Sequence, residues 1–251
     1  MNLAIDIGNT TIGCAVVKKN KVFKTYHISS TLERRHLAFE IEGLLKKIGN
    51  KYGRPHRVIV CSVVPNILFL LESAVRMTWD LKPIIVGRDI KVPLKNLYQN
   101  PTQVGQDRLV GAYAAKIFFK APCIVIDLGT AITFDVVSRK GEYLGGVIVP
   151  GLRLSLESLH LKTALLPKIK IRAPKAVIGK STQQSMLSGI FYGYGSLCQG
   201  IIELISRQIG GNPKIIMTGG HTHLMKRFID RKIRILDENL VFKGLSLLTP
   251  D

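Results

Sequence analysis

Short apolar runs alternate with longer amphipathic segments along the whole chain. Runs of four to eight apolar residues bounded by Gly, Pro, Asn or Asp are typical of strands, and apolar residues at i, i+3, i+4 spacing are typical of helices. This pattern predicts strands over 2–8, 11–18, 21–27, 57–62, 83–86, 123–128, 132–138, 142–149, 214–217 and 233–235. It predicts helices over 31–48, 65–78, 105–120, 151–162, 183–209, 221–228 and 239–247. Strands and helices alternate after an opening antiparallel meander in each half, which indicates an α/β fold.

A short stretch at the N-terminus recurs near the middle of the chain. Residues 4–17 and 125–137 both read as an apolar strand, an Asp, an apolar residue, a Gly, a Thr and a second apolar strand. The two aspartates, Asp6 and Asp127, lie 121 positions apart in a chain of 251 residues. The repeat predicts two related halves, 1–118 and 119–251, each opening with a β-hairpin. No Ser/Gly-rich linker separates them, so we expect the halves to share the 105–120 helix and a cleft.

The chemistry of the repeated turn favours a bound phosphate. A Gly in a tight turn lets backbone N–H groups approach a ligand closely, and successive N–H groups form an anion-binding concavity. An Asp beside it repels phosphate but can hold a cation that the phosphate also touches. Two such turns would hold the phosphates of a nucleotide from both sides. The alternative is a pair of ordinary hairpin turns with capping Asp and Thr, and the repetition at half-chain spacing makes that alternative the weaker one.

Composition excludes several classes of protein. Hydrophobic residues make up 46% and charged residues 21% of the chain, which is too apolar for a disordered protein. The longest apolar stretch, 58–71, contains Ser62, Pro65 and Asn66 and is shorter than the ~20 residues that cross a bilayer. The first residues carry no basic run and are interrupted by Asp6, so we expect no signal peptide.

The four cysteines form no CxxC pair, which makes a zinc site or a dithiol motif improbable. We interpret them as reduced, mostly buried thiols of a cytoplasmic protein.

A formal net charge of +19 requires that nucleic acid be considered as a partner. The excess is spread evenly, because residues 1–118 hold 18 basic and 8 acidic residues and residues 119–251 hold 18 and 9. An even excess without a run of like charges favours a solvated basic surface over a dedicated nucleic-acid site.

Six motifs, in this order, resemble those of the type III pantothenate kinases, a family with the actin-like ATPase fold. Two of them are the repeated turns, which resemble the phosphate motifs of that fold. The six are 6–10 (DIGNT), 61–65 (CSVVP), 98–108 (YQNPTQVGQDR), 127–130 (DLGT), 145–151 (GGVIVPG) and 179–182 (GKST) followed by Met186 and Gly189. Each motif alone is weakly specific, whereas their order, spacing and coverage of residues 4 to about 220 are specific together.

The resemblance implies a fold, a reaction and a set of partners. The fold is two ribonuclease H-like domains, each a mixed sheet with flanking helices, around a nucleotide cleft. The reaction is transfer of the γ-phosphate of ATP to the primary hydroxyl of pantothenate, the first step of coenzyme A biosynthesis. The resemblance further implies Mg²⁺, a monovalent cation such as K⁺ or NH₄⁺, and a homodimer with pantothenate bound near its interface.

The resemblance also implies roles for individual residues. A hydroxyl that attacks phosphorus must lose its proton, and Asp107 matches the family's proposed base. Asp127 matches the ligand of the monovalent cation, and Asp6 is expected to orient Mg²⁺ through water. The residues expected to bind pantothenate are Tyr98, Gly105, Gln106, Asp107, Arg108 and, from the partner subunit, Thr182. The residues expected to bind ATP are Asp6, Ile7, Gly8, Asn9, Thr10, Thr11, Ile12, Gly13, Thr130, Gly219 and Gly220.

One position departs from the family, and each role has a structural alternative. Gln106 stands where family members more often carry a small residue such as Ala, so we expect its side chain to point away from the substrate. Asp107 and Arg108 alone would be a surface pair in the first turn of a helix, where Asp favours the positive end of the dipole. Tyr98 alone would be a packing residue, and Thr182 alone a cap.

Three motifs are better explained without a ligand. Gly179-Lys180-Ser181 lacks the upstream glycine of a Walker A loop, because position 174 is a proline. Gly193-Tyr194-Gly195 falls inside a helical pattern, where we expect it to allow close packing of two helices. The two histidines of His221-Thr222-His223 do not share a helix face, so a metal site there is improbable.

Two other functions remain open alongside pantothenate phosphorylation. One is a non-catalytic homologue that acts as a regulator, like the Bvg accessory factor, for which the net charge is an argument. The other is a different small-molecule kinase of the same fold, because fold alone does not fix the substrate. The joint presence of the three aspartates 6, 107 and 127 with Arg108 favours an enzyme.

Overall fold

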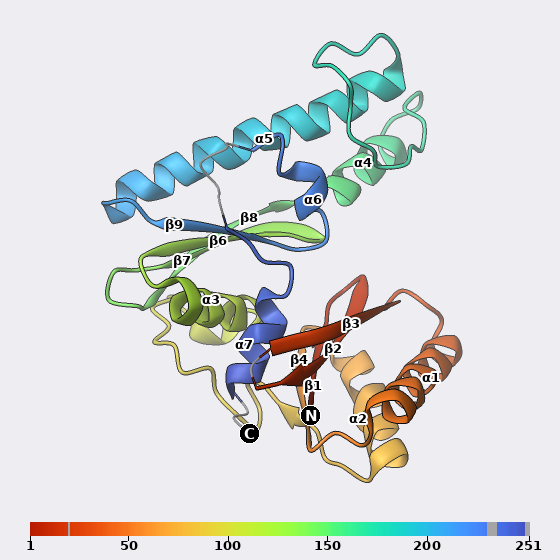
Figure 1. The fold of residues 1–251 in the computed structure, drawn as a ribbon. Helices are drawn as coiled ribbons and strands as arrows, with labels where there is room; N and C mark the ends of the chain where they lie inside the picture. The colour runs from red at the N-terminus through yellow and green to blue at the C-terminus, as the bar shows by residue number, and fades with distance from the viewer. Residues whose placement is uncertain (20, 230–234, 249–251) are drawn as a thin grey trace. The chain divides into compact units, whose positions relative to one another are not determined.

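A computed structural model describes residues 1–19, 21–229 and 235–248. The chain divides into two compact units (Figure 1). The first is Met1–Ile117 together with the C-terminal segment from Asn239, and the second is Phe118–Glu238. The sequence predicted a change of unit near residue 118 but assigned the last helix to the second half. In the structure that helix, α7 (Leu240–Leu248), contacts three strands of the first unit.

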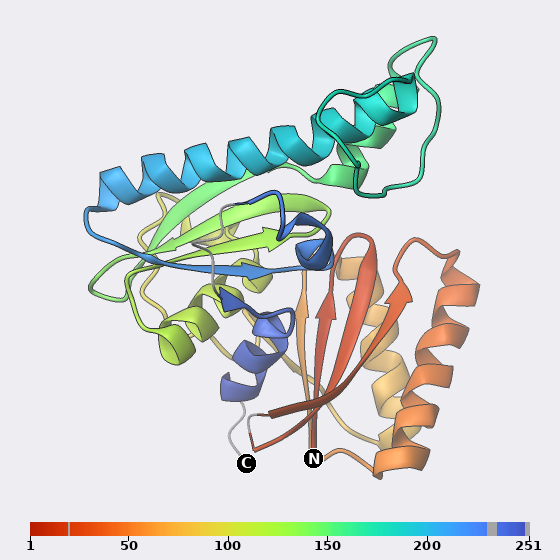
Figure 2. The ribbon, with the colours of Figure 1, turned by 45° about the horizontal axis from the view of Figure 1, so that its top comes forward.

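The first unit is built on a five-stranded mixed sheet. Its strands are β1 (Asn2–Ile7), β2 (Thr11–Lys18), β3 (Lys21–Ser29), β4 (Arg57–Ser62) and β5 (Ile84–Ile85). They lie in the order β3-β2-β1-β4-β5, with the first three antiparallel to one another and β4 and β5 parallel to β1 (Figure 2). The antiparallel meander follows from the short turns between the first three strands, whereas the parallel strands each need a crossover helix.

Alternation of side chains along β1 divides the core of this unit between the two faces of the sheet. Leu3, Ile5 and Ile7 point to the face covered by α1 (Arg34–Tyr52) and α2 (Pro65–Trp79). Ala4 points to the opposite face, where it clusters with residues of α3 (Gln106–Phe119) and α7. Because Asp6 follows the same alternation as Ala4, it lies on the face of α3 and α7.

The second unit repeats this topology. Its strands are β6 (Cys123–Leu128), β7 (Ala131–Val137), β8 (Tyr143–Pro150), β9 (Lys214–Thr218) and β10 (Ile235–Leu236). They lie in the order β10-β9-β6-β7-β8, with β6, β7 and β8 antiparallel and β9 and β10 parallel to β6. Side chains of α4 (Leu152–Leu161) and of the long helix α5 (Thr182–Ile209) cluster with the apolar residues of β6 and β7. The internal repeat in sequence is therefore a repeat of the whole sheet.

The predicted α/β fold with two mixed sheets is confirmed, and the predicted elements differ from the structure mainly at their ends. The helix predicted over 221–228 is only the short α6 (Thr222–Met225), and a 3₁₀ turn, η1 (Pro101–Gln103), was not predicted. The strand predicted over 233–235 falls partly outside the described residues, since only its last position belongs to β10.

The C-terminal helix fits the first unit because two glycines make room for it. A Cβ on Gly244 of α7 would lie 2.5 Å from the carbonyl oxygen of Val110 in α3. A Cβ on Gly13 of β2 would lie 2.6 Å from a ring carbon of Phe242. Larger residues at either position would push α7 away from the sheet, since protein interiors leave few gaps.

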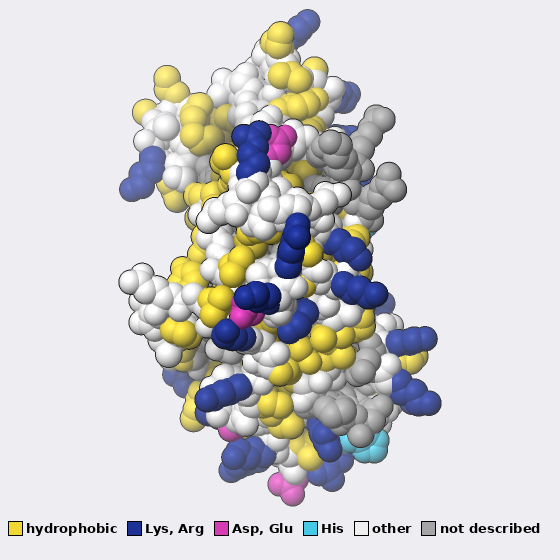
Figure 3. Space-filling view, turned by 90° about the vertical axis from the view of Figure 1, so that its left-hand side faces the viewer, with side chains coloured by type: hydrophobic (Ala, Val, Ile, Leu, Met, Phe, Trp, Pro, Cys, Tyr) yellow, Lys and Arg dark blue, Asp and Glu magenta, His cyan; other side chains and the backbone are white. Residues whose placement is uncertain are grey.

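All four cysteines are buried free thiols, as predicted. Burial raises the pKa of Cys123 and Cys198 to about 12, so neither thiol is ionised near neutral pH. Within the described residues, no helix is both long and apolar enough to cross a membrane. The face in Figure 3 carries many Lys and Arg side chains and few Asp or Glu, scattered among apolar patches.

Candidate active site

The turn between β1 and β2 is held from two sides. The Gly8 N–H donates to the carbonyl of Thr11 at 3.0 Å, which closes the turn. The Ser30 N–H donates to the carbonyl of Thr10 at 3.1 Å, which ties the turn to the end of β3. Asn9, Thr10 and Thr11 are exposed. The turn is thus fixed in place while its polar side chains stay accessible to a ligand.

The apolar residues predicted in the same ATP segment serve the core. Ile7 and Ile12 are buried and pack under α1 and α2, so only their backbone groups can reach a ligand. Gly13 pairs with Asp6 in the β1–β2 ladder, and its lack of a side chain accommodates Phe242. The structure therefore explains the glycine at this position by packing.

Two carboxylates approach the buried thiol of Cys61 in β4. Burial raises the pKa of Cys61 first, and the negative charges of Asp6 and Asp107 raise it further. Asp6 lies directly opposite Cys61 in the parallel β1–β4 ladder, and Asp107 lies in the first turn of α3. Residues 101 positions apart in sequence therefore meet at the carboxyl ends of two parallel strands, which is where open α/β sheets bind ligands.

The Asp107 carboxyl group has a perturbed affinity for protons. Burial raises its pKa. Weaker influences lower it, among them the hydrogen bond that the Arg108 N–H donates to Asp107 Oδ1 at 2.9 Å and the positive charge of Arg108. A Cβ on Gly105 would collide with the same Oδ1 atom and would lie 3.6 Å from Val63 Cγ1. Gly105 thus lets the carboxyl group fold back over the backbone, and a raised pKa there suits proton abstraction near neutral pH.

The turn that follows β4 joins this corner to the first hairpin. The Val63 N–H donates to the carbonyl of Ile7 at 3.1 Å, which extends the β1–β4 pairing by one bond. The Ser62 hydroxyl accepts from the N–H of Val64 at 3.1 Å, and Pro65 begins α2 at the position where its missing N–H costs nothing. The CSVVP motif therefore fixes the position of Val63 beside Gly105.

Gln106 points toward the turn after β5. A Cβ on Gly87, whose φ is +88°, would lie 2.8 Å from the amide carbon of Gln106. The glutamine side chain thus covers a glycine that also needs the left-handed backbone conformation. This contact supplies a packing reason for Gln106.

Tyr98 lies in a loop fixed by two asparagines. Its N–H donates to Asn96 Oδ1 at 2.9 Å. Asn100 Oδ1 accepts from the hydroxyl of Thr102 at 2.7 Å and from its N–H at 3.3 Å, which caps η1. The contact that fixes Tyr98 is thus a hydrogen bond of its backbone. The corner described above holds Asp6, Asp107 and Gly105.

The second turn, between β6 and β7, repeats the closure of the first. The Gly129 N–H donates to the carbonyl of Ala131 at 3.1 Å, and the N–H of Gly151 donates to the carbonyl of Thr130 at 3.0 Å. The Thr130 side chain is exposed. The GGVIVPG segment, which forms most of β8, thus returns to close the turn just before α4 begins.

Asp127 is held in a corner lined by two glycines. A Cβ on Gly219, whose φ is +92°, would collide with Asp127 Oδ1 and would lie 2.6 Å from the N of Leu128. A Cβ on Gly129 would lie 3.4 Å from the same carboxylate oxygen. Gly220 has open space around it. Glycines at these positions leave the backbone close to the carboxylate and room for a ligand beside it.

His221 lies against the second turn, which the sequence did not indicate. The backbone N–H of His221 donates to the carbonyl of Leu128 at 3.1 Å. Burial lowers the pKa of the imidazole most, and the positive charge of Arg153 lowers it further. Hydrogen bonds with the backbone of Leu128 and Gly129 raise this pKa, but by less. The sequence raises only the question of a metal site formed with His223, which it makes improbable, and in the structure the exposed His223 pairs with Glu238 at 3.1 Å. A neutral ring at the turn is the feature that sequence analysis missed.

Thr182 is the exposed first residue of α5. The Ser181 hydroxyl caps the helix by accepting from the N–H of Gln184 at 3.3 Å, while Gln184 Oε1 accepts from the N–H of Lys180 at 2.8 Å. A Cβ on Gly179 would collide with the N of Ser185. These contacts fix the GKST segment as a helix cap that presents Thr182 to solvent.

Among the described residues, no three His, Cys, Asp or Glu side chains gather into a cluster that could hold a metal ion. Kinases bind Mg²⁺ through one or two carboxylates together with the phosphates of the substrate. A half-buried Asp6 at the end of β1 fits that kind of site.

Comparison with known proteins identifies the family. The sequence profile of the type III pantothenate kinases matches residues 2–204. A type III pantothenate kinase of Persephonella marina is 40% identical over 98% of this chain and 96% of its own length. One from Anaeromyxobacter dehalogenans is 37% identical over 99% and 98%. The chain belongs to the type III pantothenate kinase family. The predictions of this family, of a kinase and of pantothenate as its substrate are thereby confirmed.

More distant solved structures share the fold of this type III pantothenate kinase. The ethanolamine utilization protein EutJ of Carboxydothermus hydrogenoformans has a TM-score of 0.60 at 12% identity, covering 98% of this chain and 89% of its own. A ROK family glucokinase of Streptomyces griseus has a TM-score of 0.53 at 12% identity, covering 98% of each chain. A protein of Campylobacter jejuni described as a Baf family transcriptional activator has a TM-score of 0.59 at 19% identity, covering 98% and 96%. At these identities the likeness concerns the fold alone.

The lowered pKa of His221 predicts how stability depends on pH. The unfolded chain protonates this histidine near its ordinary pKa of about 6.5, whereas the folded chain does so only at lower pH. The unfolded state therefore binds more protons in that window, and the free energy of unfolding falls as pH drops below about 6.5. Urea unfolding at pH 8 and pH 5.5 measures this fall, which should shrink in His221→Gln.

The control is His56→Gln, because His56 is an exposed histidine of the first unit. That variant should keep the full fall in stability. If both variants or neither variant reduce the fall, His221 is not its source.

Proposed function

We propose that this chain phosphorylates pantothenate with Asp107 as the base, and that ATP, Mg²⁺ and a monovalent cation bind at the two repeated turns. The observation that carries the proposal is the raised pKa of the Asp107 carboxyl group beside Asp6 at the carboxyl ends of β1 and β4. A buried carboxyl group costs stability when it ionises. The presence of the Asp107 carboxyl group in the first turn of α3 is therefore better explained by a role in proton transfer than by packing.

Proton abstraction is the step assigned to Asp107. The primary hydroxyl of pantothenate becomes a stronger nucleophile as its proton passes to the carboxylate, while its oxygen attacks the γ-phosphorus. Gly105 and the N–H of Arg108 hold the carboxyl group in one orientation. The guanidinium of Arg108 is assigned to the pantothenate carboxylate, for which a planar fork of donors is suited. Tyr98 is assigned a hydrogen bond to the same substrate.

The two turns are assigned to the nucleotide. Exposed Asn9, Thr10 and Thr11 in the first turn and Thr130 in the second are donors for phosphate oxygens. Mg²⁺, oriented by Asp6 through water, would neutralise charge that develops on the phosphates. Gly219 and Gly220, which follow β9, are assigned to adenosine, and the open space beside Gly220 supports this.

A regulator without catalysis is the alternative that shares this fold, and a different small-molecule kinase is another. A regulator has no use for a buried carboxyl group with a raised pKa, and the even spread of the +19 charge offers no single nucleic-acid surface. The family match favours pantothenate over other substrates.

Replacement of the base tests the proposal directly. Asp107→Asn should lower kcat about 100- to 10,000-fold, the usual contribution of a general base, and should leave ATP binding intact. Its melting temperature should stay the same or rise, because the variant no longer buries an ionisable carboxyl group. Release of ADP with ATP, Mg²⁺ and pantothenate measures the first effect, and calorimetry measures the others. In the wild type, kcat/KM should fall in acid with an apparent pKa above the ordinary aspartate value of about 3.8.

Two variants of α3 and its N-terminus separate placement of the carboxyl group from a general disturbance. Gly105→Ala should lower kcat at least tenfold, because its Cβ displaces Asp107 Oδ1. Gly111→Ala lies on the same helix, where its Cβ would meet Val241 at an ordinary 4.0 Å, and should keep kcat. Full activity in Asp107→Asn would refute the assignment of the base. Salt-sensitive DNA binding without any turnover would favour the regulator.

The cation site makes a separate prediction. If Asp127 holds a monovalent cation, wild-type turnover should be at least tenfold faster in K⁺ or NH₄⁺ than in Na⁺. Asp127→Asn should lose this preference, because a neutral amide attracts a cation less strongly. The same ADP assay in the three salts measures it. Asp135→Asn is unsuitable as a control, since Asp135 accepts from buried Tyr143 at 2.7 Å; exposed Asp80→Asn serves instead. A variant of Asp127 that retained the preference would place the cation elsewhere.

A homodimer formed through the second unit is the last part of the proposal. Large apolar side chains are exposed along one consecutive stretch of this unit, which indicates an interaction surface. They are Leu144, Ile148, Leu154, Leu159, Leu161, Leu165, Val177 and Ile178. Thr182 directly follows this stretch, which supports its assignment to the substrate of a partner subunit.

Charged substitutions in that stretch should yield monomers. Leu165 and Ile178 are 91% and 82% exposed, so Leu165→Asp and Ile178→Asp should not disturb the core. We expect sedimentation to give a dimer of 27.8 kDa chains for the wild type and a monomer for the double variant, with KM for pantothenate raised at least tenfold. Met77→Asp, 75% exposed in the first unit, is the control. A wild-type monomer would contradict the proposal.

A further inference from the structure

Within the described residues, strand β3 is the last strand of the first sheet and has no strand on its outer side. It pairs with β2 alone, in the order β3-β2-β1-β4-β5. Among the described residues, no backbone hydrogen bond reaches the outer edge of Lys21–Ser29. An open edge of nine residues is a template for another extended chain unless it is covered or repelled.

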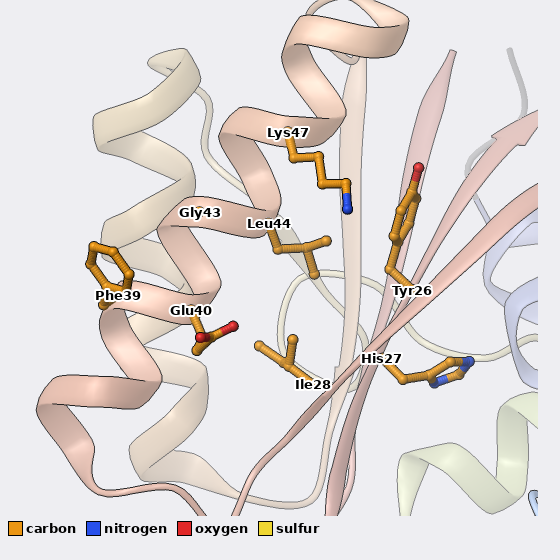
Figure 4. A pocket seen from close by; sticks show the side chains of 8 residues that line it. All are labelled: Tyr26, His27, Ile28, Phe39, Glu40, Gly43, Leu44 and Lys47. Atoms are coloured by element: carbon orange, nitrogen blue, oxygen red, sulfur yellow. The ribbon is translucent and has the colours of Figure 1, made fainter.

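Helix α1 overhangs this edge and leaves a cavity of about 270 Å³ beneath it (Figure 4). Tyr26 and Ile28 point from β3 toward the helix, while His27 points away from it. The cavity is lined by Tyr26, His27, Ile28, Phe39, Glu40, Gly43, Leu44 and Lys47. A Cβ on Gly43 would meet nothing within 4 Å, so the helix wall is open at that point. Phe39, one turn earlier, is 74% exposed.

The size of the cavity suits a side chain better than a free metabolite. Sites for small molecules are usually ~300–1,000 Å³ and enclose most of the ligand. This cavity is smaller and is partly open to solvent. An added strand would place every second side chain on the face of α1, so one of them would enter the cavity.

The charge around the edge is positive. Lys21 and Lys24 are exposed on β3, and the ammonium of Lys47 lies 5.8 Å from the centre of the Tyr26 ring. Lys51 lies 5.4 Å from the centre of the Tyr52 ring. The carboxylate that lines the cavity, Glu40, lies with its Oε1 3.4 Å from His36 Nε2.

Two of these lysines also contribute to the lowered pKa of Tyr52 in α1. A hydrogen bond from Tyr26 lowers this pKa most, and the charges of Lys51 and Lys24 lower it further.

Like charges select against a second copy of this chain as the occupant. Two β3 strands side by side would bring their lysines together, which is a common way to prevent edge-to-edge association. The same lysines attract a strand of opposite charge. We propose that the edge of β3 and the flank of α1 form a docking groove for an extended acidic segment of a partner protein, which adds a strand beside β3 and inserts one apolar side chain into the cavity.

The groove predicts a pattern in its ligand. Lys24, Tyr26 and Ile28 all lie on the α1 face of the sheet, because every second residue of a strand faces the same side. A bound strand would therefore have one side chain beside the lysine and another, two positions along, beside the cavity. An acidic residue and a bulky apolar residue separated by one position fit this arrangement. Backbone hydrogen bonds would supply affinity, and the lysine and the cavity would supply specificity.

The groove is independent of the candidate active site within the first unit. Asp6 and Asp107 lie on the face of the sheet covered by α3 and α7, whereas the cavity lies on the face of α1. The catalytic assignments and the groove can therefore fail separately.

A peptide titration tests the proposal. The probe is a short blocked peptide of alternating glutamate and valine in which phenylalanine replaces the central glutamate, so that glutamates lie two positions from it on the same face. It is added to ¹⁵N-labelled full-length protein. We expect amide shifts in Lys21–Ser29 and along α1, and an affinity that falls at least tenfold between low and high salt. The counterpart with lysine in place of glutamate should cause no shifts there.

Two variants locate the binding site. A Cβ at Gly43 has open space, so Gly43→Leu adds a side chain to the cavity from the helix side and should weaken binding at least tenfold. Gly200→Leu is the matched control, because a Cβ at this position of α5 also has open space, and should bind as the wild type does. Lys24→Glu should abolish binding of the acidic peptide. Circular dichroism and melting temperature establish that each variant is folded.

Four results would overturn the proposal. They are no shifts in β3 at millimolar peptide, equal binding of the lysine peptide, unchanged binding by Gly43→Leu, and shifts in β3 that depend on protein concentration alone. The last would show that a second copy occupies the groove.

Discussion

The parallel pairing of the first strand of each unit with the strand after the crossover is the constraint on which the rest of the structure depends. β1 pairs with β4 and β6 pairs with β9, so their carboxyl ends lie at the same edge of each sheet. At that edge the hairpin turn of the repeat meets a second turn that arrives from far along the chain. In the first unit the second turn brings Val63 beside Gly105, which lies against Asp107, and in the second unit it brings Gly219 against Asp127. Each unit therefore holds an aspartate beside a glycine at this edge, although the aspartate is Asp107 of α3 in the first unit and Asp127 of the repeated turn in the second.

The glycines in these corners act on the aspartates rather than on turns alone. Gly105 and Gly219 each occupy the place where a side chain would collide with a carboxylate oxygen. A methyl group at either position would move the carboxylate without removing it. These two positions therefore control the orientation of the acids, although neither residue carries a functional group.

Most of the fold could be predicted because its signals are local. Apolar runs and helical spacing mark the elements, and the repeated DxG turn marks where each unit begins. The place of α7 could not be predicted, because a repeat shows where a unit starts and says nothing about a segment that returns to it. The fit of α7 depends on Gly244 beside Val110 and on Gly13 beside Phe242, which are contacts between positions more than 100 residues apart.

The candidate site was predicted less completely than the fold. The motifs indicated Asp6, Asp107 and Asp127, but burial decides the pKa of Asp107, and burial depends on the whole unit. His221 shows the same limit, since its sequence neighbours suggest only a metal ligand, while its effect depends on β6 and Arg153 across the unit. Gln106 looked like a departure from the substrate segment and is explained by Gly87, which lies outside that segment.

The position of α7 has a consequence for synthesis on the ribosome. The first unit leaves the ribosome early, yet one face of its sheet lacks α7 until the whole second unit has been translated. During that interval Ala4, Ala15 and Ile59 lack their contacts with α7, and only α3 is available to cover their face of the sheet. The unit that is made first is completed last, after the whole second unit has emerged. Nascent chains of this protein therefore pass through a long interval in which a chaperone, or a neighbouring nascent chain, can reach the incompletely covered face.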